Sequence, residues 1–171
     1  GFLYRGGANA FPLQRILAET VGGDFWSVDI ADVNGDGARE ILAVIDDSTF
    51  GVFRLEGNTV VEKARFVNPT SPGSEPYNSF DAPRAAFGDF NANGKPDILL
   101  GDRDADFFIA EHDGGSYRII WGAENDFIDG GDFVAAGDFD GDGRDEFAIG
   151  FRTMEEDVVP FSFFWIFRLK F

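Results

Sequence analysis

Residues 138–150 have the sequence DFDGDGRDEFAIG, and the same thirteen-residue pattern recurs without gaps as DVNGDGAREILAV at 32–44 and DFNANGKPDILLG at 89–101. The three copies begin 57 and 49 residues apart. Self-similarity at a spacing of this kind is the signature of a repeat architecture. The first nine residues of the copies are called loop 1 (32–40), loop 2 (89–97) and loop 3 (138–146) below.

Short apolar runs flank every loop, and further strand-like runs follow the first two. Runs rich in Val, Ile and Phe, bounded by Gly, Asn and Asp, predict β-strands joined by turns. Glu56-Gly57-Asn58 is a typical hairpin turn between two such runs. Four strands in about 50 residues is the composition of a propeller blade, so an all-β fold of β-propeller-type blades with four antiparallel strands is expected. The predicted strands are 27–30, 41–45, 49–55, 59–66, 85–87, 98–100, 107–111, 117–121, 133–136 and 147–149.

The spacing predicts one propeller domain over residues 1–171 with about three blades. Residues 1–20 would supply strands of an incomplete blade, and the blades would span 24–67, 84–124 and 132–171. The segment Phe11–Glu19 is ambiguous between strand and helix, because it contains Pro12. Propellers usually have four to eight blades. A partial propeller is therefore expected, or one that a second copy or a partner chain completes.

Residues 161–171 alternate between an aromatic face and a mixed one, which predicts a β-strand. Two interpretations stay open. The strand is either buried in the core, or it is an edge that pairs with another chain.

Oxygen-bearing side chains recur at alternate positions of each loop. Positions 1, 3 and 5 are Asp or Asn, position 6 is Gly and position 9 is an acid. Such side chains on a tightly curled loop converge on one centre, where Gly permits the turn and the position 7 carbonyl can join, so a hard cation such as Ca²⁺ is expected. An EF-hand is excluded, since it needs an acid at position 12, and here that position is Ala43, Leu100 or Ile149.

The loop pattern resembles that of FG-GAP and VCBS repeats, which occur in integrin α-subunit propellers and in microbial surface and carbohydrate-active proteins. The resemblance covers about 140 residues, and Phe87-Gly88 matches the FG of the name. Glu at position 9 of loops 1 and 3 departs from the more usual Asp. The resemblance implies up to three calcium ions, held by side chains at positions 1, 3, 5 and 9 and by the carbonyl at position 7: Asp32, Asn34, Asp36, Ala38 and Glu40; Asp89, Asn91, Asn93, Lys95 and Asp97; Asp138, Asp140, Asp142, Arg144 and Glu146.

The number of carboxylates differs between the loops. Loop 3 contains four at the implied ligand positions, loop 1 three and loop 2 two. Because ligand charge tunes calcium affinity, we hypothesise that loop 3 binds most tightly and loop 2 most weakly. The predicted role of the ion is structural, since bound calcium would offset the repulsion between the acids.

The composition limits the partners. The 31 Asp and Glu against 14 Lys and Arg give a net charge of −17, which disfavours nucleic acid. The 44% hydrophobic content with 21 Phe favours a folded domain, and the absence of Cys leaves the redox compartment open. No transmembrane segment is expected, because the chain has no apolar run of the required length.

The sequence lacks the usual signs of an enzyme. Its single His, His112, lies in a predicted turn, and there is no Cys nucleophile and no phosphate-binding glycine loop. We expect a non-catalytic calcium-binding module of a surface or secreted protein that acts in adhesion or assembly, with an extracellular or cell-surface location. The alternative is a carbohydrate-binding module or an accessory part of a polysaccharide-active enzyme, in which Trp26, Tyr77 or Trp121 would stack on sugars.

Overall fold

The computed structural model describes residues 3–5, 14–17, 28–45, 49–57, 59–67, 84–101, 106–114, 116–123, 133–152 and 162–170. These residues form β-strands and turns, with no helix among them. The predicted all-β fold class is confirmed. The ambiguous segment Phe11–Glu19 contains a strand, β2.

The strands form three antiparallel sheets and one small hairpin. Sheet 1 has the order β3-β4-β5-β6, sheet 2 the order β7-β8-β9-β10, and sheet 3 the order β11-β12-β13. Each sheet is a simple meander, as in a propeller blade. The strands are β1 (Leu3–Arg5), β2 (Gln14–Leu17), β3 (Val28–Ala31), β4 (Glu40–Val44), β5 (Thr49–Glu56), β6 (Thr59–Val67), β7 (Arg84–Gly88), β8 (Asp97–Gly101), β9 (Phe107–Asp113), β10 (Ser116–Ala123), β11 (Phe133–Gly137), β12 (Glu146–Arg152) and β13 (Ser162–Phe167).

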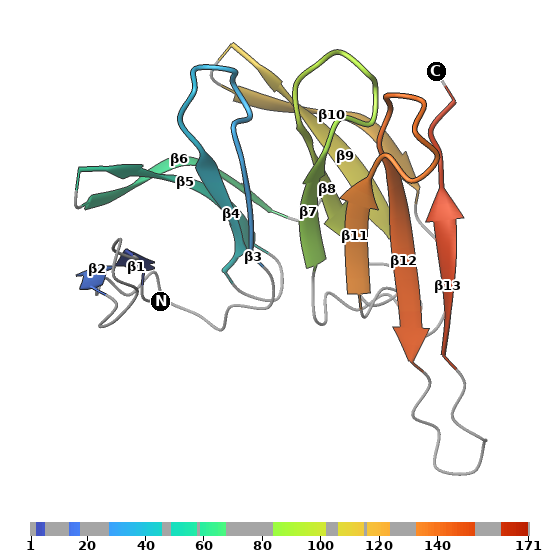
Figure 1. Cartoon of the computed structure of the whole chain (residues 1–171), viewed down its shortest axis with the longest axis horizontal. Coiled ribbons are helices and arrows are strands. Elements are labelled where there is room, and N and C mark those ends of the chain that lie inside the picture. Colours follow the sequence, from blue (N-terminus) through green and yellow to red (C-terminus); the bar gives the residue numbers. More distant parts are fainter. Residues whose placement is uncertain are drawn as a thin grey trace.

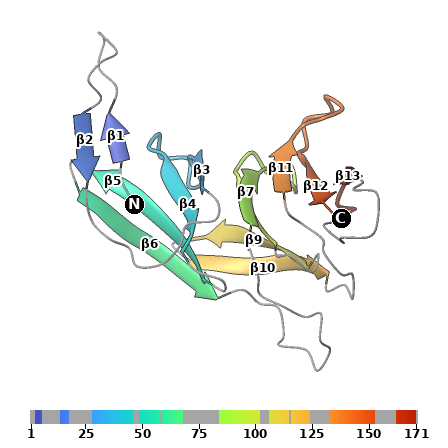
Figure 2. The same ribbon diagram turned by 90° about the horizontal axis from the view of Figure 1, so that it is seen from below.

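The first strands of the three sheets lie next to one another. β7 contacts both β3 and β11, and Figure 2 shows the sheets fanning out from these inner strands, with β6 and β10 far from them. The fan does not close into a ring. Because β3, β7 and β11 run in the same direction, loops 1, 2 and 3 all lie at the same end of the molecule, at the top of Figure 1.

Apolar side chains join the sheets face to face. One buried cluster joins sheet 1 to sheet 2, and includes Leu42, Phe50 and Ile98. A second joins sheet 2 to sheet 3, and includes Leu99, Ile109 and Phe147. Strand residues alternate in direction, so each sheet has one face toward the preceding sheet and one toward the next.

The second residue of loops 1 and 2 inserts its side chain into the interface with the next sheet. Val33 is 1% exposed within the cluster that joins sheets 1 and 2. Phe90 is fully buried and meets Phe147 of sheet 3 edge to face at 5.8 Å. Its ring lies over Gly88, where an added Cβ would come within 2.7 Å of the ring. The equivalent Phe139 of loop 3 is 48% exposed.

The last strand, β13, is packed on one face and open on the other. Phe167 stacks on Phe147 with ring centroids 5.2 Å apart. On the opposite face, Phe164 is 67% exposed and Ile166 is 54% exposed. The side chains on the first face are themselves partly exposed, Trp165 at 41% and Phe167 at 38%, while Leu169 beyond the strand is buried. Among the described strands β13 is therefore an edge strand of sheet 3, and its pairing with another chain stays a prediction.

Phe90 and Phe139 provide a matched test of the packing between sheets. Phe90→Ala empties a buried site and is expected to lower the free energy of unfolding by about 3–5 kcal/mol. Phe139→Ala removes a half-exposed ring from the same loop position and is expected to cost less than about 1 kcal/mol. Urea unfolding of both variants measures the difference. Equal losses would contradict the inference that the second loop residue joins adjacent sheets.

Candidate metal centre

Each loop connects the first strand of a sheet to the second, and its first carboxylate organises the turn. In loop 3, Asp138 Oδ1 accepts the N–H groups of Gly141 at 2.7 Å and Asp142 at 3.0 Å, and its Oδ2 accepts that of Gly143 at 2.9 Å. Asp32 in loop 1 accepts all three corresponding bonds. Asp89 in loop 2 accepts those of Asn93 and Gly94, while the N–H of Ala92 is donated to the Asp89 backbone carbonyl at 3.4 Å. These backbone donors, chiefly Gly143, hold the pKa of Asp138 below its usual range.

The carboxylate at position 9 is buried in all three loops. Glu40 is 2% exposed, Asp97 1% and Glu146 3%. In loops 1 and 3 one of its oxygens accepts the N–H of the position 2 residue, at 3.1 Å from Val33 and 3.0 Å from Phe139. This bond directs the position 2 side chain. The other oxygen is left for a different partner.

The middle of each loop follows the same pattern. The side-chain oxygen at position 3 accepts the N–H of position 5, as in Asn34 with Asp36 at 2.9 Å. The oxygen at position 5 accepts the N–H of position 7 at 2.8–3.0 Å, from Ala38, Lys95 and Arg144 in turn. That the position 7 carbonyls bind a cation stays a prediction.

The turn that the three loops share needs a left-handed backbone at positions 4 and 6. Position 6 is Gly in every loop, with φ of 86° at Gly37, 82° at Gly94 and 89° at Gly143. Position 4 also has positive φ, and there loop 2 places Ala92 at 57°. The curled loop that the Gly pattern predicted is therefore present.

Three residues that sequence reasoning missed face the position 9 carboxylates from the third strand of each sheet. Glu40 is paired with Arg54 across β4 and β5. The β8–β9 pairing ends at Ile98 and Ala110, and the β12–β13 pairing at Phe147 and Phe167, so the next residues place Glu111 opposite Asp97, and Arg168 opposite Glu146. A signal was present, because Arg54 and Glu111 each lie 14 residues after the position 9 acid. Arg168 lies 22 residues after it, because the β12–β13 connection is longer.

In loops 1 and 3 this residue is an arginine whose guanidinium reaches the loop carboxylates. Arg168 binds Asp140 at short range, Glu146 at 2.8 Å and Asp142 at 3.4 Å. Arg54 lies 2.6 Å from Asp36 and 3.6 Å from Glu40. The hydrogen bond from Arg54 lowers the pKa of Asp36, and the bonds to Asp140 and Glu146 raise the pKa of Arg168.

In loop 2 the equivalent residue is an acid. Glu111 Oε1 accepts the side-chain amides of Asn91 at 3.1 Å and Asn93 at 2.8 Å. Its Oε2 faces outward and binds Arg118, whose side chain is 62% exposed, at 3.0 Å. Burial raises the pKa of Asp97 to about 7, and the charges of Glu111 and Asp89 add to the effect. Asp97 Oδ2 is buried without a hydrogen-bond partner.

The residues present fit a calcium ion. In loop 3, oxygens of Asp138, Asp140 and Glu146 lie within 4.8 Å of one another, a spacing compatible with ligands at 2.3–2.6 Å from one ion. In loop 2, the unpartnered Asp97 Oδ2 is a buried acceptor that a cation would satisfy. The donor sets consist of carboxylate and amide oxygens, which a hard cation prefers.

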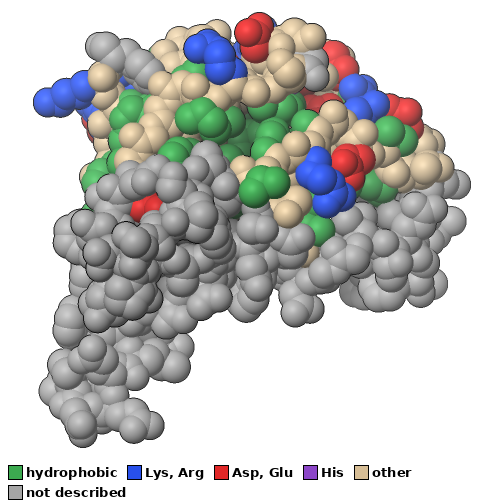
Figure 3. All heavy atoms as spheres, turned by 180° about the vertical axis from the view of Figure 1, so that it is seen from behind, with side chains coloured by type: hydrophobic (Ala, Val, Ile, Leu, Met, Phe, Trp, Pro, Cys, Tyr) green, Lys and Arg blue, Asp and Glu red, His purple; other side chains and the backbone are tan. Residues whose placement is uncertain are grey.

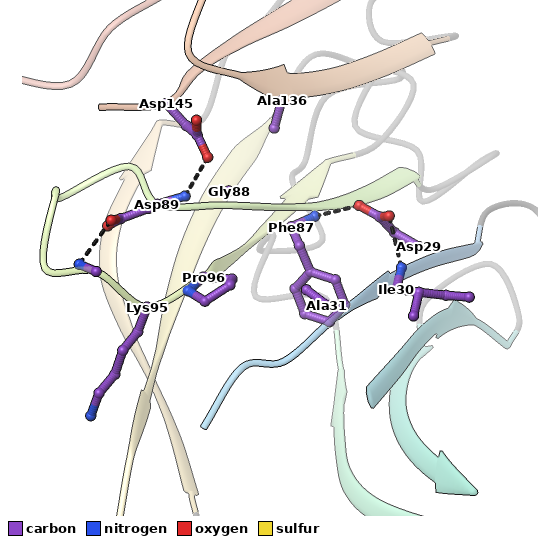
Figure 4. Close-up of a pocket in the computed structure, with 11 residues that line it drawn as sticks. Asp29, Ile30, Ala31, Phe87, Gly88, Asp89, Lys95, Pro96, Ala136 and Asp145 are labelled. Atoms are coloured by element: carbon purple, nitrogen blue, oxygen red, sulfur yellow. Dashed lines mark hydrogen bonds between the residues drawn. The ribbon is translucent and has the colours of Figure 1, made fainter. Parts of the chain in front are cut away.

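Loop 2 is also tied to the neighbouring sheets (Figure 4). Asp145 of loop 3 accepts the N–H of Asp89 at 2.7 Å and donates its own N–H to the Asp89 carbonyl at 3.1 Å. On the other side, Asp29 of β3 accepts the N–H of Phe87 at 2.7 Å. The geometry of loop 2 therefore depends on both sheets beside it. Figure 4 shows the Lys95 side chain pointing away from Asp89.

Comparison with known families agrees with this geometry. Residues 32–100 match the model of the FG-GAP-like repeat. The FG-GAP resemblance is confirmed. The matched stretch contains loops 1 and 2, while loop 3 lies outside it but has the same hydrogen bonds. No curated protein gives a significant match to the chain.

The remaining candidates from the sequence lie outside the loops, although His112 lines a cavity with Asn34 and Glu40 of loop 1. Trp121 packs against the cluster between sheets 2 and 3, and His112 is half-buried, with its ring 5.1 Å from that of Tyr117. Trp26 and Tyr77 lie outside the described residues. Among the described residues, no helix is long and apolar enough to cross a membrane.

The first carboxylate of loop 3 is expected to matter for folding even without metal. Asp138→Asn removes the oxygen that accepts from Gly143 and turns an amide donor toward that N–H, so the midpoint of urea unfolding in EDTA should fall. Asp142→Asn is the matched control, because its single backbone bond, from Arg144, can be kept by the amide oxygen. Equal midpoints for the two variants would contradict the assignment of Asp138 as the organiser of the loop.

Proposed function

We propose that the chain is a non-catalytic, calcium-binding β-propeller module of a secreted or cell-surface protein that acts in adhesion or assembly. The observation that carries the proposal is the shared loop geometry: the first, third and fifth side chains bind the loop backbone at equivalent corners of three sheets, and three carboxylate oxygens of loop 3 lie within 4.8 Å of one another. The unpartnered Asp97 oxygen adds a buried acceptor that suits a cation.

The proposed role of calcium is structural. The loops join the two innermost strands of each sheet, and loop 2 is bonded to sheet 3 through Asp145. An ion bound there would offset the repulsion between carboxylates and hold the corner of the blade. Binding to the folded state alone stabilises a protein by RT ln(1 + [L]/Kd).

Calcium is expected to raise the thermal midpoint of the chain, and EDTA to lower it. At a hundredfold excess over Kd the gain is about 2.7 kcal/mol for one site. Differential scanning calorimetry in calcium, magnesium and EDTA, with isothermal titration of calcium, measures the effect. A midpoint that is unchanged by EDTA, together with no heat of binding, would overturn the proposed calcium sites.

The proposed partner is a protein, and a second copy of the chain fits best. Within the chain, one face of each sheet receives the next sheet through buried apolar side chains. On the outer side of sheet 1, Ala43, Ile45 and Phe53 form a further buried cluster, and exposed apolar side chains remain on β3 and on the outer face of sheet 3. Figure 3 shows hydrophobic side chains at the surface of one face of the molecule. Large exposed apolar patches mark interaction sites. These residues are Val28 and Ile30 in sheet 1, and Phe133, Phe139, Phe164 and Ile166 in sheet 3.

The open faces predict concentration-dependent self-association that the variant Phe164→Glu weakens. Phe164 is 67% exposed on the outer face of sheet 3, and a charge there would have to be buried in the contact. Ile119→Glu is the control, because Ile119 is 44% exposed on the outer strand β10. Size-exclusion chromatography with light scattering measures the mass. A wild-type monomer at all concentrations would argue against completion by a second copy.

Carbohydrate binding is the alternative proposal, but its described aromatic candidate, Trp121, is committed to packing. Retention on a glycan array by a monomeric chain would favour it over assembly.

A further inference from the structure

We propose that the residue facing the position 9 acid from the third strand decides how each loop is neutralised: Arg54 and Arg168 serve loops 1 and 3 as internal cations, whereas Glu111 leaves loop 2 dependent on a divalent ion. This inference rests on the proposed calcium binding, and refines which loop needs the ion.

Arg168 makes the contacts of a cation in loop 3. Its guanidinium binds side chains from positions 3, 5 and 9, namely Asp140, Asp142 and Glu146. Those are three of the four carboxylates that would surround a metal. A guanidinium forms planar, multiple hydrogen bonds to carboxylates, so it can hold the acids together without an ion. A calcium ion entering loop 3 has to displace or share these contacts.

Arg54 acts in the same way in loop 1, with fewer contacts. It binds Asp36 and lies near the buried Glu40, whose Oε1 has no hydrogen bond. The positive charge of Arg54 thus offsets part of the negative charge of the loop 1 acids.

Loop 2 has the opposite arrangement. Glu111 brings a third carboxylate toward Asp89 and Asp97, and the only described base bonded to it, Arg118, is bonded to its outward oxygen. Asp97 Oδ2 is left unpartnered at 1% residue exposure. A buried acceptor without a donor is destabilising, and no arginine reaches into this loop among the described residues. A bound cation would supply the missing partner of Asp97 Oδ2, and Glu111 would join as a further ligand by exchanging its bonds to the Asn91 and Asn93 amides.

The facing residues change the order of calcium affinity expected for the three loops. Counting acids within the loops makes loop 3 the tightest site. Including the facing residues adds a positive charge to loops 1 and 3 and a negative one to loop 2. The summed charge then becomes −3 for both loop 2 and loop 3, and −2 for loop 1. Because Arg168 already occupies the carboxylates of loop 3 and no arginine does so in loop 2 among the described residues, we expect loop 2 to be the tightest site in the intact chain, and loop 3 to bind tightly only when Arg168 is removed.

Calcium titration calorimetry on the full chain, with thermal unfolding in EDTA, tests the proposal through charge variants at the three facing positions. Glu111→Gln is expected to weaken the tightest site by at least about tenfold, since ligand charge tunes affinity over orders of magnitude, without lowering the midpoint in EDTA. Arg168→Gln is expected to show the reverse: a calcium affinity raised by about tenfold at one site, and a lower midpoint in EDTA. Arg54→Gln repeats the test in loop 1 should Arg168→Gln fail to fold.

Matched controls separate charge from packing. Arg168→Lys keeps the charge but loses the planar guanidinium, so its calcium affinity should lie between those of the wild type and Arg168→Gln. Arg118→Gln removes the outer partner of Glu111 and should leave the tightest site unchanged or stronger. Asp97→Asn should abolish that site, whereas Glu40→Gln should leave it intact, which assigns it to loop 2.

The outcomes distinguish the two proposals. Calcium binding by the wild type with no change in Glu111→Gln and Arg168→Gln would overturn the charge assignment and leave structural calcium standing. Absence of calcium binding in the wild type and in every variant would overturn the proposed function itself.

Discussion

A buried carboxylate at the ninth position of each loop is the constraint on which the rest of the structure depends. Glu40, Asp97 and Glu146 are each 1–3% exposed at the start of the second strand. In loops 1 and 3, one oxygen of this acid accepts the N–H of the second loop residue, and in loop 1 that residue is Val33, whose side chain is buried between sheets 1 and 2. The other oxygen requires a positive partner, because an isolated buried charge is costly. Packing between blades and the demand for a cation therefore originate in the same side chain.

The three sheets pack against one another in sequence order. Each presents one apolar face to the preceding sheet and one to the next, and loop 2 in the centre is bonded to both neighbours through Asp29 and Asp145. The packing is non-directional and follows from apolar area. In sheets 1 and 2 the face toward the next sheet is buried. In sheet 3 the equivalent face carries the exposed side chains of Phe133, Phe139 and Phe164. Assembly with a further blade would thus use contacts that the chain already makes internally.

Charge balance links the loops to the whole molecule. With a net charge of −17, clustering acids at the corners of the blades adds to a repulsion that favours the unfolded state. The structure relieves it in two ways. Guanidinium groups enter loops 1 and 3, and backbone N–H groups bind the first carboxylate of every loop. Buried carboxylate oxygens without a hydrogen bond remain in loops 1 and 2, at Glu40 and Asp97. Arg54 lies 3.6 Å from the Glu40 oxygen, whereas loop 2 has a glutamate at the equivalent position, which is why loop 2 is the loop that we propose depends most on a metal.

The sequence by itself determined the repeat, the class of fold and the centre of each candidate site. Strand alternation and the Asp, Asn and Gly positions are local properties, so the all-β meander and the curled loops could be predicted from residues close together in the chain. Only the tertiary structure decided what faces the loops. Arg54, Glu111 and Arg168 reach them through strand pairing, over separations of 14 and 22 residues. Phe90 and Phe139 occupy the same position in the pattern, yet one is buried and the other exposed, because burial depends on whether another sheet packs there. A charge count taken along the loops therefore misses the residues that set their electrostatics, since Coulomb interactions depend on distance in space and not along the chain.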